Sequence, residues 1–372
     1  MSRYGLCRFI VSVALLSSVV GLPAEAQQGG TELWPQVHSN RRVTFYLRAP
    51  AAQQATLEAN FLSEPEAMTK DAEGLWSVAI GPLDPEIYEY NFKVDGLAIA
   101  DPMNPFVKVW RRNARSMVLV PGDSPMFYEE QNVPHGTVHV HRYHSKSLDV
   151  TRGLYIYTPP GYETSGPLRY PVLYLLHGSG DTEDAWTIVG RANLIADNAM
   201  AAGRARPMIV VMPYGHTPSI SSDRTRPRNW KSFESDLIGD VIPFVEKNYR
   251  THSGSEHRAI VGLSMGGGQS LRIGLGHPEM FGWVGAFSSS APSSEELDTL
   301  LARPENVNEK LRLLWIGCGR KDFLFEANQK FLAALEAKTI RHTAHITDGG
   351  HEWPLWRHYL NEVLPLLFDT GK

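Results

Sequence analysis

The chain has 372 residues, 42% hydrophobic and 20% charged, and this composition excludes an intrinsically disordered protein. Its formal net charge of -4 at pH 7 leaves no basic surplus to bind a phosphate backbone, so nucleic acid is not an expected partner. The length is enough for one large hydrophobic core or for two domains.

Residues 1–26 have the three parts of a secretory signal peptide. Arg3 and Arg8 precede an apolar run from Phe9 to Val20, and the segment AEA that follows offers a cleavage site between small residues. A membrane anchor is the alternative, but the run is shorter than the ~20 residues that cross a bilayer. We therefore expect cleavage after residue 26, a secreted or periplasmic protein, and no attachment to the membrane afterwards.

Cleavage at that position separates the two cysteines. Cys7 lies in the predicted signal peptide before the apolar run, so it is not placed to carry a lipid anchor. Cys318 then remains alone, within the apolar segment LRLLWIGCG. The mature protein is expected to contain no internal disulfide, and Cys318 is interpreted as a buried, unreactive thiol.

Residues 27–120 are predicted to form a small antiparallel β-sandwich. Short alternating segments such as VTFYLR, GLWSVAI and EIYEYNFKV are separated by turn residues, with no helical pattern between them. The sequence VDG at Val94–Gly96 is typical of a hairpin turn. Residues 121–134 (PGDSPMFYEEQNVP) contain three prolines and no clear period, which predicts a linker.

Residues 135–372 are predicted to form an α/β domain. After two alternating segments, GTVHVHRYHS and TRGLYIYT, apolar strands alternate with helices. The predicted strands are 170–178, 207–215, 257–264, 281–290, 311–319 and 343–350, and the predicted helices are 192–203, 233–249, 268–278 and 324–338. This alternation indicates a mainly parallel sheet covered on both faces, with its chemistry at the carboxyl ends of the strands.

The stretch VGLSMGGGQS contains the pattern G-x-S-x-G followed by two further glycines. The apolar segment RAIV leads into Gly262, and a predicted helix follows Met265. A strand that reverses sharply into a helix forces the central residue into a strained conformation, so its neighbours must lack bulk. The context predicts that Ser264 is a nucleophile that projects above the sheet.

A serine hydroxyl needs a base to remove its proton and an acid to orient that base. In sites of this type the acid and then the histidine follow the serine along the chain. Asp322 comes just after a predicted strand and His351 lies in a glycine-containing loop after the last one, so we assign them as acid and base. Asp348 is the alternative acid, although aspartate is also a common turn residue. The other candidates are interpreted as structural or surface residues. His342 and His345 lie in a predicted strand, and His358 lies on the predicted final helix. Asp236 and Asp240 are expected on a solvated helix face or in a local salt bridge.

An oxyanion hole should complete such a site. Attack on a carbonyl places negative charge on its oxygen, and donors already aimed at that point stabilise it. One donor is expected to be the backbone N–H of Met265, and the other is assigned to Gly178 and Ser179, in the loop after an earlier strand. His177, in the same loop, is interpreted as a packing and hydrogen-bonding residue.

Several motifs fall in an order that resembles a known family. The segments YPVLYLLHGSGDTEDAW, GRANLIADN, HRAIVGLSMGGGQSLRIGL and DGGHEWPLWR are similar to the feruloyl and acetyl xylan esterases of carbohydrate esterase family 1. The resemblance covers nearly all of the chain from about Pro134. It implies an α/β-hydrolase fold, no metal or organic cofactor, a triad of Ser264, Asp322 and His351, and oxyanion donors near Ser179 and at Met265.

The first domain has a resemblance of its own. The segments VTFYLRAP, GLWSVAIGPL and YEYNFKVDGLAIADPMNP are similar to the immunoglobulin-like modules of carbohydrate-binding module family 48. Sugar binding needs exposed aromatic faces. Burial is expected for Trp76, Tyr88 and Tyr90 in the alternating strands, so Trp34 and Trp110 are the better candidates. A structural or site-shaping module is an equal alternative.

The expected substrates are feruloylated or acetylated xylan and its oligosaccharides. A feruloyl ester presents a flat aromatic acid, whereas an acetyl ester presents an acyl group of two carbons. Aromatic residues near the strand ends therefore favour the interpretation as a feruloyl esterase over an acetyl xylan esterase. The residues expected to form an apolar slot, each with a core or rim position as the alternative, are Trp186, Trp230, Phe233 and Trp353.

Two more distant functions stay open. A siderophore esterase also joins a sandwich to an α/β-hydrolase domain, but Leu263 stands where glutamine is expected, and export argues against intracellular iron release. A non-catalytic carbohydrate-binding protein is the other alternative. The intact set of serine, aspartate and histidine argues against it.

Overall fold

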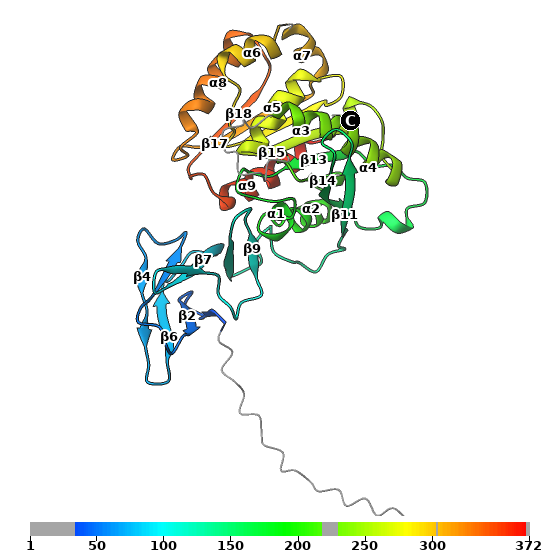
Figure 1. Cartoon of the computed structure of the whole chain (residues 1–372). Helices are drawn as coiled ribbons and strands as arrows, with labels where there is room; N and C mark the ends of the chain where they lie inside the picture. The colour runs from blue at the N-terminus through cyan, green and yellow to red at the C-terminus, as the bar shows by residue number, and fades with distance from the viewer. Residues whose placement is uncertain (1–33, 218–229, 303, 370–372) are drawn as a thin grey trace, which may run out of the picture.

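The computed structural model describes residues 34–217, 230–302 and 304–369 (Figure 1). The predicted signal peptide lies outside these residues. None of the helices in the described part combines the length and the apolar character that crossing a bilayer requires. The described residues form a strand-rich first domain and a larger domain of mixed helices and strands, which confirms the predicted fold class.

The first domain is a sandwich of two mainly antiparallel sheets. One sheet has the order β1-β2-β6-β5, and the other has the order β4-β3-β7-β10-β9 with β8 paired to β7. Their bounds are β1 Gln36–Val37, β2 Val43–Arg48, β3 Ala55–Ala59, β4 Glu66–Ala67, β5 Thr69–Lys70, β6 Leu75–Ile80, β7 Glu86–Val94, β8 Leu97–Ile99, β9 Val107–Val109 and β10 Ala114–Val120. Alternate residues of β2, namely Val43, Phe45 and Leu47, are buried between the sheets, as the period of two in the sequence requires.

The β7–β8 hairpin has the turn that the sequence VDG predicts. Asp95 and Gly96 both have positive φ angles, 45° and 89°, which a tight hairpin turn with the twist of its strands needs. The Asp95 carboxylate also accepts hydrogen bonds from the backbone N–H groups of Gln53 and Gln54. The turn is therefore held to the neighbouring loop.

The segment between the domains, predicted as a linker, has no helix or strand from residue 121 to residue 136. It is nevertheless packed onto the second domain. Tyr128 is fully buried, and the side-chain amide of Asn198 donates hydrogen bonds of 2.9 Å to the carbonyl oxygens of Phe127 and Glu129. The connection is an integral part of the hydrophobic core.

The second domain is built on a sheet of eight strands in the order β11-β12-β14-β13-β15-β16-β17-β18. The strands β11, β12 and β14 pair antiparallel, and from β14 to β18 all neighbours are parallel. Their bounds are β11 Thr137–Ser145, β12 Val150–Thr158, β13 Val172–Leu176, β14 Ile209–Pro213, β15 Arg258–Leu263, β16 Trp283–Phe287, β17 Leu313–Gly319 and β18 Thr343–Thr347.

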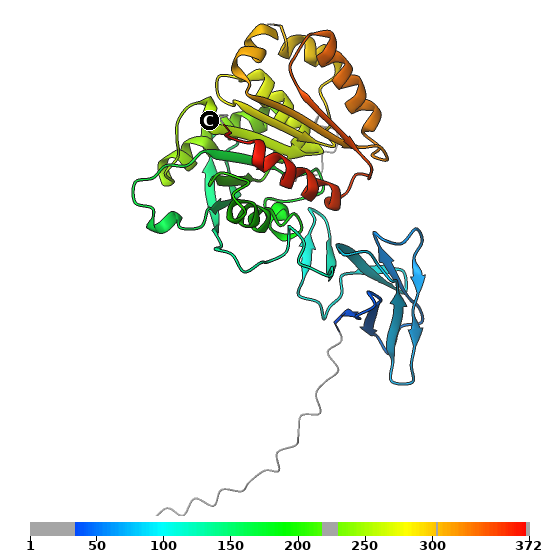
Figure 2. The ribbon, with the colours of Figure 1, turned by 180° about the vertical axis from the view of Figure 1, so that it is seen from behind.

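Helices cover both faces of this sheet (Figures 1 and 2). Their bounds are α1 Ala185–Ile188, α2 Ala192–Ala201, α3 Trp230–Asp236, α4 Ile242–Asn248, α5 Met265–Gly276, α6 Ser294–Leu300, α7 Pro304–Lys310, α8 Phe325–Ala337 and α9 Trp353–Val363, with a π-helical segment η2 Leu237–Val241 and short 3-10 turns η1 Tyr162–Thr164, η3 Ser255–His257 and η4 Leu364–Leu366. In β13, Val172, Tyr174 and Leu176 contact the layer of α3 to α8, whereas Leu173 and Leu175 contact the layer of α1, α2 and α9. Figure 2 shows α9 lying across the second face.

Apart from α9, which is the final helix predicted around His358, the structure contains three short helices that the sequence does not predict. Helix α1 has only four residues, and α6 and α7 contain too few apolar residues to show a helical period. Helix α6 has a capping box, in which Ser293 and Glu296 each accept the other's backbone N–H. That pattern of serine followed three residues later by glutamate is a start signal that was present in the sequence.

The two domains share a core. Ile87 and Met117 of the sandwich and Tyr128 of the connection belong to the same buried cluster as the residues of α2 and α9. Arg357 of α9 is fully buried within this junction. Its guanidinium donates a hydrogen bond of 2.7 Å to the carbonyl oxygen of Val189 and forms an ion pair with Glu86 of β7. Its guanidinium lies 4.8 Å from the centre of the Tyr128 ring.

We expect Arg357→Met to lower the free energy of unfolding by about 3–5 kcal/mol, because removing one partner of a buried ion pair leaves the other charge without compensation. Chemical denaturation followed by far-UV circular dichroism measures the change. The matched control is Arg206→Met, whose arginine lies 3.9 Å from Asp369 in a half-exposed pair and should change stability by less than about 1 kcal/mol. An equally small loss for both variants would contradict the structural role given to Arg357.

Candidate active site

The turn between β15 and α5 holds Ser264 in a strained conformation. Its φ of 52° and ψ of -113° lie in a region that L-residues rarely adopt and that costs about 1–3 kcal/mol. The neighbouring strand holds the backbone in this conformation, because the N–H of Ser264 donates a hydrogen bond of 2.8 Å to the carbonyl oxygen of Phe287 at the end of β16. The side chain is thereby carried to the carboxyl edge of the parallel sheet.

The glycines around Ser264 are explained by close approaches of the backbone. A Cβ on Gly262 would lie 2.5 Å from the carbonyl oxygen of Gly266, and a Cβ on Gly266 would lie 2.6 Å from the carbonyl oxygens of Leu176 and His177. A Cβ on Gly268 would lie 2.3 Å from the carbonyl oxygen of Ser290. The glycine run therefore lets α5 begin directly against β13 and β15.

A continuous chain of hydrogen bonds joins Ser264, His351 and Asp322. The Nε2 atom of His351 is 3.0 Å from the Oγ atom of Ser264, and its Nδ1 atom is 2.9 and 3.0 Å from the two carboxylate oxygens of Asp322. With Nδ1 protonated toward the carboxylate, Nε2 is free to accept the hydroxyl proton of the serine. The structure therefore brings together the three residues assigned from the sequence.

The carboxylate of Asp322 is fully buried and held in its charged form. Burial alone would raise the pKa of Asp322, but hydrogen bonds from His351, Ser288 and the backbone N–H of Leu324 outweigh it and lower the pKa below its ordinary value. The imidazole also contacts Trp356 in a T-shaped arrangement, with 4.9 Å between the ring centres. Its orientation is therefore fixed by both polar and apolar contacts.

The alternative acid and bases lie elsewhere. The side chain of Asp348 is 95% exposed and is 3.9 Å from Arg320, so it does not reach the imidazole. His342 contacts the carbonyl oxygen of Ile340. The other two histidines contact aromatic rings, with His345 stacked on Trp315 and His358 tilted against Phe127.

The position of Asp236 differs from the solvated helix face or local salt bridge considered for it, whereas Asp240 is partly exposed on a helical segment. Asp236 is fully buried, and its Oδ2 atom lies 2.9 Å from the Nε atom of Arg152, a residue far from it in the sequence. Asp240 accepts hydrogen bonds from the backbone N–H groups of Lys146 and Ser147. Both carboxylates hold the β11–β12 turn region against the helical layer, and neither contacts Ser264.

The loop after β13 lies over the nucleophile. A Cβ on Gly178 would be 2.8 Å from the Cδ1 atom of Leu263 and 3.6 Å from the Cβ atom of Ser264, so the backbone of the loop approaches the serine closely. Ser179 follows, partly exposed. On the other side, Met265 is the first residue of α5, and its N–H has no acceptor within the helix. The predicted oxyanion donors thus lie on two segments that flank Ser264.

His177 holds this loop from below. It is buried, its Nδ1 atom is 2.8 Å from the carbonyl oxygen of Gly178, and its Nε2 atom accepts the N–H of Gly215 at 2.9 Å. Burial lowers the pKa of His177, which keeps the ring neutral. With both nitrogens occupied, the ring has the hydrogen-bonding role expected for it.

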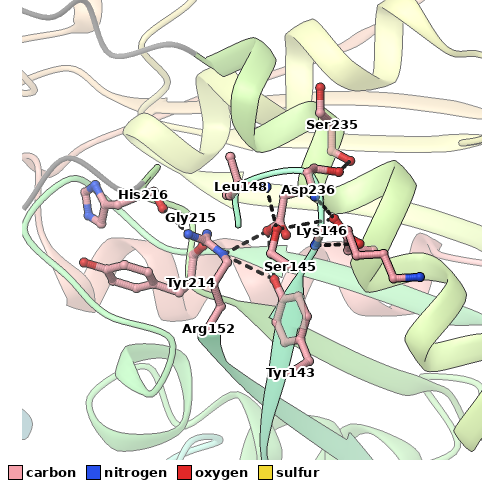
Figure 3. A network of polar contacts seen from close by, with 12 residues as sticks. Tyr143, Ser145, Lys146, Leu148, Arg152, Tyr214, Gly215, His216, Ser235 and Asp236 are labelled. Carbon is pink, nitrogen blue, oxygen red and sulfur yellow. Dashed lines mark hydrogen bonds and ion pairs between the residues drawn. The ribbon is translucent and has the colours of Figure 1, made fainter. Parts of the chain in front are cut away.

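A buried polar network that the sequence did not reveal supports the same region (Figure 3). Arg152 donates 2.7 Å to the carbonyl oxygen of His216 and also donates to that of Tyr214, while its Nε atom pairs with Asp236. Gly215, between those two carbonyls, contacts His177. Arg152 therefore fixes the segment that supports the loop over Ser264, and an arginine in an alternating strand gave no sign of this.

The aromatic slot predicted from the sequence is largely incorrect. Trp186 is 1% exposed, donates its indole N–H to the carbonyl oxygen of Leu176, and packs on Trp353, which is 5% exposed. Phe233 is fully buried on the opposite face of the sheet. These rings fill the hydrophobic core and cannot present a face to a substrate. Trp230, the first residue of α3, is partly exposed, so its predicted role in substrate binding stays a prediction.

The structure instead exposes a different ring beside the triad. Phe323 directly follows Asp322, is 75% exposed, and has its ring centre 4.4 Å from that of His351. The apolar residue next to the acid was visible in the sequence, but only the structure places it outside the core.

The remaining predictions about chemistry concern Cys318 and metals. Cys318 is buried with no disulfide partner, and burial raises its pKa to about 12, so it is an unreactive thiol as expected. Within the described ranges, no three histidine, cysteine or acidic side chains gather in a way that could hold a metal ion.

Comparison with known proteins places this chain in a family. A family model described as "Putative esterase" matches residues 145–367. The endo-1,4-beta-xylanase/feruloyl esterase of Xylanibacter ruminicola is 32% identical over 357 residues, which cover 93% of this chain and 47% of that protein. The chain therefore spans about half the length of this curated relative.

Solved structures agree with the family match. The ferulic acid esterase of carbohydrate esterase family 1 from Anaeromyces mucronatus is 26% identical, with a TM-score of 0.57 over 66% of this chain and 96% of the other. An enterochelin esterase from Shigella flexneri, 19% identical, has a TM-score of 0.66 over 88% of this chain and 92% of the other, which shows a shared fold alone. The chain belongs to this esterase family of α/β-hydrolases, in the group that includes the ferulic acid esterases of carbohydrate esterase family 1.

Proposed function

We propose that this chain hydrolyses carboxylic esters through an acyl-enzyme intermediate on Ser264. The observation that carries the proposal is the unbroken series of hydrogen bonds from the Oγ atom of Ser264 through His351 to Asp322. A strained serine at a strand-to-helix turn, a buried carboxylate and an imidazole between them are the parts that activate a hydroxyl group.

The reaction follows from this geometry. The Oγ atom of Ser264 attacks the ester carbonyl carbon while its proton passes to the Nε2 atom of His351, and the carbonyl oxygen becomes an oxyanion. As the intermediate collapses, the C–O bond to the alcohol breaks and the imidazolium returns the proton to the leaving oxygen. Water then attacks the acyl-enzyme with the same base, releasing the acid and regenerating the serine. Asp322 stabilises the imidazolium and keeps the ring in the required tautomer.

The oxyanion is proposed to be bound by backbone N–H groups of Met265 and of the loop formed by Gly178 and Ser179. These groups belong to a helix start and to a turn whose backbone lies against Ser264, so they do not need to reorganise during the reaction. Loss of one such donor typically costs about 3 kcal/mol of transition-state stabilisation.

The proposed substrate is a feruloyl group on xylan or its oligosaccharides. Relatives that carry the name feruloyl or ferulic acid esterase support this choice. The exposed ring of Phe323 beside His351 offers an apolar contact for a phenolic acyl group. It takes the place of Trp186, Phe233 and Trp353, the three buried rings of the predicted slot.

Acetylated xylan is the second candidate substrate. The observation in its favour is that those three rings are buried in the core, so the described residues supply fewer aromatic walls for a large acyl group than the sequence suggested. An apolar site discriminates between acyl groups by only ~1–3 kcal/mol per methylene, so both esters remain within its chemistry. Export through the predicted signal peptide of residues 1–26 is part of the proposal, because polymeric xylan must be met outside the cell.

We expect Ser264→Ala to abolish hydrolysis of an aryl acetate while the fold is retained, because the nucleophile is removed and a methyl group fits the turn. Release of the chromophoric alcohol measures the rate, and labelling by a fluorophosphonate should be lost in parallel. The control is Ser294→Ala, an exposed serine on α6, which should keep full activity. A Ser264→Ala enzyme with the wild-type rate would refute the proposed mechanism.

We expect Asp322→Asn to lower kcat by a factor on the order of 10³–10⁴, because an amide orients the imidazole in the wrong tautomer and cannot stabilise its charge. Since the pKa of Asp322 is lowered in the folded protein, the wild-type carboxylate stays ionised through the neutral pH range, and the loss should persist across that range. The matched control is Asp348→Asn, which removes the other candidate acid. Loss of activity in Asp348→Asn rather than Asp322→Asn would reverse the assignment.

We expect Phe323→Ala to lower kcat/KM on methyl ferulate about fivefold, the equivalent of an aromatic contact of ~1 kcal/mol, and to leave an aryl acetate within twofold. Steady-state kinetics on both esters measures the ratio. Phe106→Ala is the control, since Phe106 is an exposed phenylalanine of the sandwich. An equal loss on both esters would show that Phe323 does not contact the acyl group.

A further inference from the structure

The loop of residues 178–181 is touched from two sides. Toward the core, Gly178 lies over Ser264, and His177 holds its carbonyl oxygen. Toward the sandwich, the loop meets the turn between β9 and β10, which Figure 1 shows at the junction of the two domains. There the N–H of Arg111 donates 2.9 Å to the carbonyl oxygen of Gly180.

Trp110 closes this contact from the sandwich side. A Cβ on Gly180 would lie 2.4 Å from the Cζ3 atom of Trp110, so the indole and the loop backbone are in direct contact. The indole is itself held by two contacts. Its Nε1–H donates a hydrogen bond of 3.3 Å to the carboxylate of Glu89, and the Nζ atom of Lys108 lies 3.8 Å from the ring centre. Trp110, considered above as a sugar-binding residue, is partly exposed and contacts both the loop and the ammonium group of Lys108.

Lys108 carries the charge of the contact. It lies on β9 and is 1% exposed, with its Nζ atom 3.2 Å from the Oε1 atom of Glu89 on β7 and 3.1 Å from the Oδ1 atom of Asp181. The two carboxylates come from different domains and are themselves buried. A charge is buried at this depth only when it is paired, so the ammonium joins the sandwich to the loop over the serine.

Asp181 passes this restraint to the backbone of the loop. Its N–H donates 3.2 Å to the carbonyl oxygen of Gly178, which closes the turn, and its Oδ2 atom would be 3.1 Å from a Cβ on Gly178. The segment that carries the proposed oxyanion donor is therefore held between His177 on one side and Lys108, Trp110 and Arg111 on the other.

We propose that the β9–β10 turn of the sandwich positions the oxyanion loop, with Lys108 and Trp110 as positioning residues for ester hydrolysis, so that the first domain is a working part of the active site. The inference rests on the proposed esterase function. Donors to an oxyanion act only when they are already aimed at the point where charge develops. Loosening this support should therefore lower kcat more than it raises KM.

A compensating pair of substitutions in the full chain tests the contact directly. Gly180→Ala forces a collision with Trp110, and we expect kcat on an aryl acetate to fall at least tenfold with KM within threefold. Trp110→Ala relieves the collision, so adding Gly180→Ala to Trp110→Ala should change kcat by less than threefold. If Gly180→Ala has no effect, or the same effect with and without Trp110, the proposal is wrong.

A second set of variants tests the charge. Lys108→Met should lower kcat at least tenfold. It should also weaken the binding of a boronic acid inhibitor, which forms an adduct with the serine, more than it weakens the binding of ferulate. Lys108→Arg, which keeps the cation, should restore part of kcat. The control Lys93→Met removes a surface lysine that lies 3.7 Å from Glu58 and should be neutral.

Active-site titration with a fluorophosphonate normalises kcat to folded enzyme, so a loss of soluble protein is not mistaken for a loss of catalysis. A normalised kcat equal to wild type in Lys108→Met would overturn the positioning role. Failure of the underlying function looks different, since wild type and Ser264→Ala would then have the same rate on every ester.

Discussion

The close approach of the chain to itself at the end of β15 is the constraint on which the rest of the site depends. Ser264 has a φ of 52°, and the glycines on both sides allow α5 to start against the backbone of β13. This arrangement puts the hydroxyl group at the edge of the sheet and the start of a helix directly behind it. Both the position of the nucleophile and the proposed donor at Met265 result from the same turn.

The carboxyl ends of β17 and β18 bring the two other members of the triad to that edge. Asp322 follows β17, and His351 follows β18, so neighbouring parallel strands deliver the acid and the base side by side. The buried carboxylate has a lowered pKa because three hydrogen bonds outweigh the effect of burial. The parallel sheet thus brings three residues that are far apart in the sequence into one series of hydrogen bonds.

The loop over the serine is supported by groups that have no direct part in the chemistry. The neutral ring of His177 joins it to Gly215, and Arg152 holds the carbonyl oxygens on both sides of Gly215 (Figure 3). On the other side the loop contacts the sandwich through Lys108 and Trp110. In this arrangement the sandwich that precedes the α/β-hydrolase domain is continuous with the core of that domain.

The sequence by itself determined the fold class and the three residues of the candidate triad, because period, glycine spacing and the order of serine, acid and histidine are local or one-dimensional signals. Only the tertiary structure decided which aromatic rings face solvent. Trp186 and Phe233 lie in the core while Phe323 is exposed, and a ring near a strand end has the same appearance in the sequence in either place. The structure also decided that Lys108 and Arg152 are buried and paired. A single cation in an alternating strand resembles a surface residue until a segment from another part of the chain covers it and supplies its carboxylate.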